Sequence, residues 1–224
     1  MNSFSLFTLS LSWVALSSLS AGDLSRYRNF QLDADLLAVV KQAGMEPADA
    51  KLIHQRPALI QELSWRPRHP LGLDADSVKD VVFSFYNGEL FRMVVNYDRY
   101  TTEGLTAGDL IEAISATYGT ALNPAAEIIL PSIYDENESV KVMARWEDSK
   151  FSFNLVRSSH DARFVLVVLS KRLDVLARAA VVEGIRLDKE GAPQREIERQ
   201  NREDERNRVQ QEKDRLSNKP GFRP

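Results

Sequence analysis

The chain has 224 residues, of which 43% are hydrophobic and 27% charged, a composition typical of a protein that folds around a core. Its 29 basic and 32 acidic residues give a net charge of -3, which lacks the positive excess expected of a protein that binds nucleic acid or an anionic membrane. The absence of cysteine excludes disulfides, thiolate nucleophiles, cysteine-ligated metals and a lipid-modified N-terminal cysteine.

The N-terminal segment, residues 1–21, carries no charged side chain, and its stretch 4–19 is apolar apart from serines and a threonine. This pattern is typical of a signal peptide, and the small residues that follow suit cleavage after Ser20 or Ala21. The serines make the segment a poor membrane anchor, because a spanning helix needs about 20 strongly apolar residues. No Lys or Arg precedes the apolar stretch, so an uncleaved anchor and a misassigned start stay open as alternatives. We expect a cleaved leader and export to the periplasm or the medium.

The mature chain begins with a predicted helix over 34–43. Asp33 is the expected N-cap, and Gly44 is a natural residue to end the helix. Two short runs of strand-forming residues follow, at 52–54 and 59–65.

A hairpin is predicted over 81–97, with its turn at Asn87 and Gly88. A two-residue turn would pair odd with even positions and set Arg92 beside Phe83, whereas a three-residue loop with a bulge pairs odd with odd. We predict the three-residue loop, because it keeps the apolar side chains on one buried face. These side chains are Val81, Phe83, Phe85, Phe91, Met93, Val95 and Tyr97.

The second half repeats this order of a helix followed by antiparallel strands. Thr106 and Asp109 predict a capping box at the start of the second helix. Pairing Trp146 with Phe151 in the next hairpin places all its alternating apolar residues on one face. These residues are Val140, Val142, Ala144, Trp146, Phe151, Phe153 and Leu155. The continuously apolar run 164–169 is typical of a strand in the centre of a sheet.

A third helix is predicted from about Arg172, with an apolar stripe that reaches Ile185. Residues 186–219 then carry ten basic and nine acidic side chains. Such a segment cannot bury enough surface to fold alone, and its apolar residues are too sparse for a coiled coil. We predict that 191–193, Gly-Ala-Pro, separates the core from a charged, partly helical or disordered tail over 188–224.

The predicted fold class is α+β, with three helices, about seven strands in one or more antiparallel sheets, and a charged helical C-terminal tail. The core is either a single domain over 22–187 or two α-plus-meander halves over 30–100 and 104–187. Trp65 precedes Phe83 by 18 residues, and a second tryptophan precedes a second phenylalanine by the same number. This spacing indicates either an internal duplication or a coincidence between two tryptophan-bearing strands.

With a duplication, the element order over 30–170 resembles the exported double α-plus-meander modules of the beta-lactamase-inhibitor-protein and outer-membrane-assembly small lipoprotein type. The chain departs from the lipoprotein branch because it has no cysteine to carry the lipid. It also resembles a family of uncharacterised exported bacterial proteins in the segments 83–92 (FSFYNGELFR), 114–119 (ISATYG) and 152–159 (SFNLVRSS). The resemblance implies export and brings no known activity.

Residue patterns that carry chemistry are weak. The histidines lack the close helical spacing of zinc ligands and are interpreted as structural or solvent-exposed: His54, His69 and His160. The run 158–161, Ser-Ser-His-Asp, holds triad residue types, but neighbours in sequence point in different directions. Two carboxylate pairs lack the further ligands of a calcium loop: Asp33 with Asp35, and Asp74 with Asp76. We therefore predict no catalytic residue, no metal site and no cofactor.

One basic and aromatic group is a candidate partner-binding surface, comprising Arg56, Trp65, Arg66 and Arg68. Arginine pairs bidentately with carboxylates and stacks on rings, so a sheet edge with these residues could recognise an anionic partner. Ordinary surface arginines are the alternative interpretation.

We expect an exported, non-enzymatic module that binds another envelope protein through its sheet or its charged tail. It needs no nucleic acid and keeps no stable membrane anchor after cleavage. The alternative is a small hydrolase or metal-dependent enzyme whose site is assembled from separated residues such as His54, His160, Asp74 and Asp76.

Overall fold

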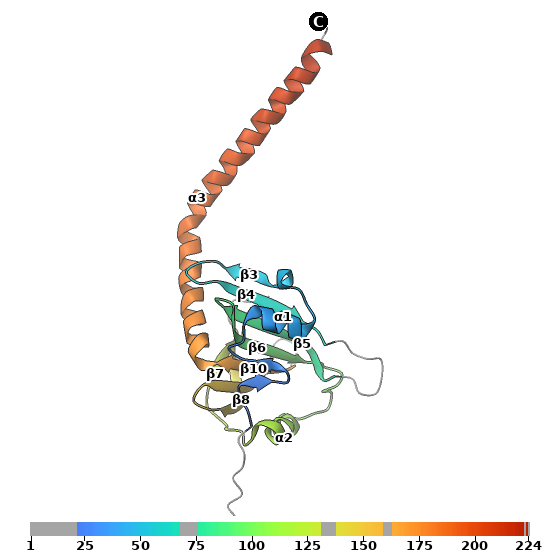
Figure 1. Ribbon diagram of the computed structural model, residues 1–224, viewed down its shortest axis with the longest axis vertical. Coiled ribbons are helices and arrows are strands. Elements are labelled where there is room, and N and C mark those ends of the chain that lie inside the picture. Colours follow the sequence, from blue (N-terminus) through green and yellow to red (C-terminus); the bar gives the residue numbers. More distant parts are fainter. Residues whose placement is uncertain (1–21, 68–75, 131–137, 159–162, 222, 224) are drawn as a thin grey trace, which may run out of the picture.

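The computed structural model describes residues 22–67, 76–130, 138–158, 163–221 and 223 (Figure 1). The fold is α+β, as predicted, and its centre is an antiparallel sheet with the strand order β3-β4-β5-β6-β10-β9-β8-β7. These strands are β3 Lys51–His54, β4 Ile60–Trp65, β5 Val78–Tyr86, β6 Glu89–Tyr97, β7 Glu127–Leu130, β8 Glu138–Glu147, β9 Phe151–Arg157 and β10 Phe164–Ser170. A separate two-stranded sheet comprises β1 Arg26–Tyr27 and β2 Phe30–Gln31.

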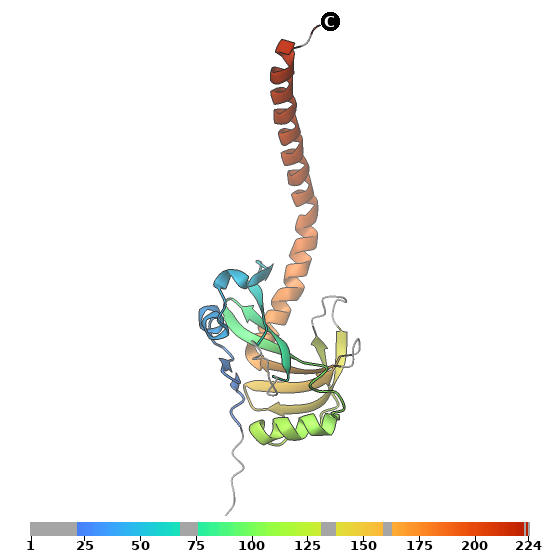
Figure 2. The same ribbon diagram turned by 90° about the vertical axis from the view of Figure 1, so that its right-hand side faces the viewer.

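Helices cover both faces of the large sheet (Figures 1 and 2). The helices α1 Leu36–Ala43 and α2 Ala107–Tyr118 pack on one face, over the main apolar core. The first part of α3 Lys171–Asn218 packs on the other face, and its remainder extends beyond the sheet. Among the described residues, no helix is both long and apolar enough to cross a membrane. The leader predicted over 1–21 lies outside the described residues.

Helix α1 ends as predicted at Gly44, which has φ 65°, but it begins two residues later than predicted. Asp33 is not the N-cap, because it has φ 62° and its backbone N–H donates to the Leu90 carbonyl oxygen at 2.9 Å. Asp35 caps the helix instead, since its carboxylate accepts a hydrogen bond from the Ala38 N–H at 2.7 Å. Helix α2 has the predicted capping box between Thr106 and Asp109.

The hairpin of β5 and β6 corrects the predicted turn. Asn87 and Gly88 have φ 50° and 86° and form a two-residue turn, because Tyr86 pairs with Glu89. A bulge at Phe91 then restores the predicted pairing of odd with odd positions further along the strands. The bulge moves Phe91 away from the apolar face predicted for it, and Leu90 takes its place in the main core.

The hairpin of β8 and β9 also differs from the prediction. Trp146 pairs with Phe153 and not with Phe151, so the register is shifted by two residues while the face is kept. A register shift between Val142 and Ala144 reverses which face of the sheet the side chains before the shift point to. Val142 therefore lies on the second face, in a valine-rich cluster, while Ala144 and Trp146 lie in the main core.

The two halves of the sheet are arranged alike. Trp65 lies in β4 and Trp146 in β8, the strands next to the two opposite edges of the sheet. Each indole N–H donates to a carbonyl oxygen at the C-terminal end of the helix in its own half, Ala43 for Trp65 at 3.1 Å and Gly119 for Trp146 at 3.0 Å. The equal 18-residue spacings do not correspond to equal positions in the sheet. Phe83 lies in β5, which pairs with the strand of Trp65, whereas Phe164 lies in β10, which does not pair with the strand of Trp146.

The helix α3 starts where predicted but does not end at the predicted boundary. It continues through Gly191 and Pro193 to Asn218 without interruption. Residues 192–218, which we call the arm, are exposed along their whole length (Figures 1 and 2). The charged tail is thus a continuous helix that stands away from the sheet.

Candidate functional site

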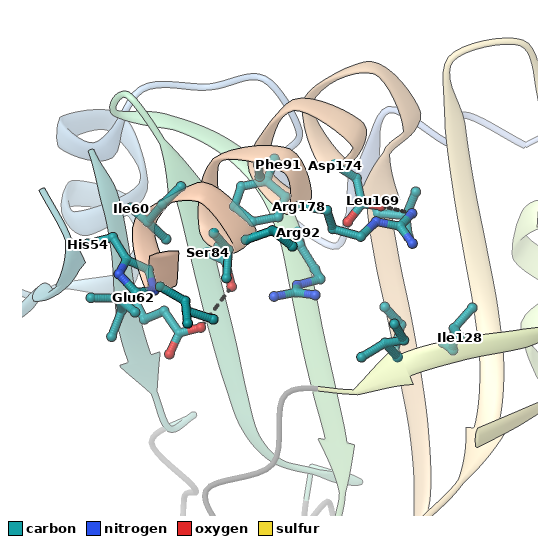
Figure 3. A pocket seen from close by; sticks show the side chains of 17 residues that line it. His54, Ile60, Glu62, Ser84, Phe91, Arg92, Ile128, Leu169, Asp174 and Arg178 are labelled. Carbon is teal, nitrogen blue, oxygen red and sulfur yellow. Dashed lines mark hydrogen bonds and ion pairs between the residues drawn. The ribbon is translucent and has the colours of Figure 1, made fainter. Parts of the chain in front are cut away.

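A cavity of about 290 Å³ lies between the second face of the sheet and the first part of α3 (Figure 3). Strands β4, β5, β6 and β10 form its floor, α3 covers it, and side chains of β3 and β7 close its sides. Most of the lining is apolar, with a small number of charged groups. Such a cavity is near the lower end of the roughly 300–1,000 Å³ range of small-molecule pockets.

The β6 bulge places two consecutive side chains in this cavity. In a regular strand Phe91 and Arg92 would point to opposite faces. Because Phe91 is the extra residue of the bulge, both side chains line the cavity on the α3 side. The Arg92 guanidinium carbon lies 5.3 Å from the centre of the Phe91 ring.

Strand register sets a polar row across the floor. Glu62 pairs with Ser84, Ser84 with Arg92, and Arg92 with Leu169 across four neighbouring strands. The Ser84 hydroxyl is buried and donates to the Glu62 carboxylate at 3.3 Å. Ser84 lies between Glu62 and Arg92 in this row, so the backbones of the two charged residues are separated by one intervening strand, β5.

Arg92 is a charged group of the floor with unused hydrogen-bonding capacity. Its Nε is buried and has no hydrogen-bond partner among the described residues. Burial lowers the pKa of the Arg92 guanidinium, and the nearby carboxylates of Asp174 and Glu62 oppose this shift. Asp174 is itself paired with Arg178 one helical turn further along α3. Arginine has so high an ordinary pKa that Arg92 remains a cation at neutral pH.

Contacts at both ends of the sheet-covering part of α3 hold the helix over the cavity. At its start, Lys171 Nζ lies 2.7 Å from a Glu147 carboxylate oxygen. Further along, the loop between β3 and β4 packs so closely that a Cβ on Gly184 would lie 2.9 Å from the Arg56 carbonyl oxygen. The Asp188 carboxylate then lies 3.6 Å from His54 Nδ1 and 3.9 Å from Arg56.

The predicted partner-binding group does not form one surface in the described residues. Arg56 precedes β4 and lies beside α3, whereas Trp65 is the last residue of β4 and packs against the core beneath α1. The Trp65 ring packs against Phe30 at 5.1 Å between ring centres. Arg66 follows Trp65 directly, and Arg68 lies outside the described residues.

The residues of the enzymatic alternative are only partly described. His54 lines the cavity, whereas Asp76 pairs with Arg28 at 2.5 Å, away from the cavity. His160 and Asp74 lie outside the described residues, as does His69. Within the described part of the chain, no group of three or more His, Asp or Glu side chains could hold a metal ion.

The cavity and its key residue were not predicted from the sequence. Leu90 and Phe91 are consecutive apolar residues, and this interruption of the alternating pattern is the signal that could have indicated a bulge. The strand β7, which closes one side of the cavity, was also missed.

Comparison of the chain with protein-family models, curated proteins and solved structures found no match.

Proposed function

We propose that the protein is an exported, non-enzymatic binding module that holds another envelope protein through its arm, residues 192–218. The observation that carries this proposal is the arm itself, a long helix in which every residue is exposed. Because none of its residues is buried against the described part of the chain, the arm is expected to add little to the stability of the sheet domain. Its role is to present side chains to a partner at a distance from that domain.

Regularly spaced ion pairs support the arm as a helix in water. Arg199 lies 2.7 Å from both Glu196 and Glu203, and Arg215 lies 2.5 Å from Glu212. Each such pair at i,i+3 or i,i+4 stabilises an isolated helix by about 0.2–0.5 kcal/mol. The arm can therefore stay helical without a partner, which lowers the entropy cost of binding one.

The surface of the arm fits a protein partner better than a polyanion. Its positive and negative charges nearly balance, so simple charge attraction to nucleic acid is weak. Val209 and Leu216 are exposed and seven residues apart, which places them on one face of the helix. A pair of apolar anchors at this spacing suits a helix that lies in a groove of another protein.

Site-specific photocrosslinking in the native host tests this proposal. A photoreactive residue replaces Val209 or Leu216, with Asn207 on the opposite side of the arm and the exposed Tyr100 of the sheet domain as matched controls. We expect one adduct of the same mass from both anchor positions and little from either control. Absence of an adduct at both anchors, or an equal yield from Tyr100, would contradict binding through the arm.

Export is supported by the uncharged apolar segment 1–21. N-terminal sequencing of the protein from its native host should give a mature chain that begins near Ala21 or Gly22. A product that begins at Met1 in the cytoplasmic fraction would contradict export.

A further inference from the structure

The cavity beneath α3 combines apolar walls with one cation on its floor (Figure 3). Aliphatic side chains line most of the cavity, including Ile128 and Ile129 of β7, Val167 of β10, and Val181, Val182 and Ile185 of α3. Arg92 projects from the floor into the space between these walls. An apolar ligand would bury its chain here, while a polar end group would meet the guanidinium.

The charged groups around the cavity differ in how far they are already engaged. Asp174 pairs with Arg178, and Glu62 accepts a hydrogen bond from Ser84 (Figure 3). Arg92 has a buried Nε without a partner among the described residues. A buried donor without an acceptor is costly, so an acceptor carried by a ligand has a large favourable effect. Because the donor is charged and planar, a carboxylate fits it best.

The size of the cavity suits a small amphiphile. A methylene group takes up about as much room as a water molecule, whose share of the liquid is roughly 30 Å³. A volume of about 290 Å³ is thus large enough for an alkyl chain of medium length.

We propose that this cavity binds a medium-chain fatty acid, with its carboxylate on Arg92 and its alkyl chain against the aliphatic side chains of α3 and β7. The site lies on the sheet domain and is separate from the arm, so this proposal does not depend on the partner proposed for the arm. It gives the protein a second binding activity, for a small anionic amphiphile.

Titration calorimetry of the full mature chain with decanoate, and with decanol as the uncharged analogue, tests the proposal. We expect the wild-type protein to bind decanoate about tenfold or more tightly than decanol, since a charged hydrogen bond forms only with the acid. Arg92→Met replaces the guanidinium side chain with an unbranched apolar one and should abolish this preference. Arg172→Met is the matched control, because Arg172 is an exposed arginine of α3 whose nearest acidic partner is Glu89, and it should leave both affinities unchanged.

A second variant covers the case in which Arg92→Met does not fold. Val182 lines the cavity and is 69% exposed, so Val182→Trp can narrow the cavity with little effect on the core. It should weaken decanoate and decanol alike. The proposal is wrong if wild-type protein binds neither ligand, if it binds both equally, or if folded Arg92→Met still prefers the acid. Unchanged decanoate binding by Val182→Trp would place the ligand elsewhere and would also overturn it.

Discussion

Phe83 and Phe153 are completely buried on the face of the sheet that α1 and α2 cover. The Phe83 ring lies 4.6 Å from that of Phe30, and the Phe153 ring lies 4.6 Å from that of Tyr118. Each phenylalanine thus connects the sheet to another part of its own half of the chain.

Truncation of either phenylalanine to alanine should lower the free energy of unfolding by about 3–5 kcal/mol, because it removes a large buried side chain and leaves a cavity. Ser84 is also buried but lies on the opposite face, where it makes one hydrogen bond to Glu62. Ser84→Ala should therefore cost only about 1 kcal/mol. Urea denaturation measures all three variants, and small, equal effects would contradict the assignment of faces.

At the scale of elements, the position of α3 depends on a glycine. The chain approaches Gly184 so closely that a Cβ there would meet the backbone oxygen of Arg56 at 2.9 Å and the His54 ring at 3.2 Å. In α2, a Cβ on Gly108 would meet only the Thr106 hydroxyl at 3.5 Å. Gly184 and Gly108 are both helical and thus differ in the packing around them and not in backbone conformation.

Gly184→Ala should destabilise the protein, although alanine is the better helix former, because the backbone of the β3–β4 loop must move. Gly108→Ala should be neutral or should stabilise it by up to about 1 kcal/mol. Thermal unfolding followed by circular dichroism compares the two variants. A stabilising effect of Gly184→Ala equal to that of Gly108→Ala would show that α3 does not pack as closely as described.

Elements marked by strong local signals could be predicted from the sequence. The capping box of Thr106 and Asp109 and the continuously apolar β10 were identified correctly. The bulge was predicted at the turn and not at Phe91. One extra residue changes the face to which its neighbours point without changing the composition of the strand, so its position leaves little signal in the sequence. The four-residue β7 offered too short a pattern to recognise.

The continuity of α3 could not be predicted for a different reason. Pro193 lacks a backbone N–H and removes a helical hydrogen bond, so a boundary was the reasonable interpretation. In the structure α3 continues through Pro193, and the Arg195 side chain donates to the Asp188 carbonyl oxygen at 2.6 Å near this proline. The candidate site could not be predicted from the sequence, because Arg92, Glu62 and the lining residues of α3 are far apart in the chain. Only strand pairing and the packing of α3 on the sheet bring them together.

At the scale of the whole molecule, the sheet domain and the arm should be separable. Deletion of residues 192–224 removes a segment whose described side chains are exposed, and it leaves the contacts of Asp188 with His54 and Arg56 in place. Scanning calorimetry should therefore show a nearly unchanged melting temperature, while a partner held by the arm is released. A fall of more than about 8 °C, which corresponds to at least about 2 kcal/mol for a protein of this size, would mean that the arm stabilises the core.

The division of the molecule into a sheet domain and a rigid arm is tested most directly by a distance along α3. The chain has no cysteine, so Ile185→Cys and Leu216→Cys give two unique sites for spin labels in one variant. Pulsed electron resonance should give a single narrow distribution near about 46 Å, because 31 residues of helix rise by about 1.5 Å each. A broad distribution centred near about 30 Å, as expected of a flexible chain of that length, would contradict the arm.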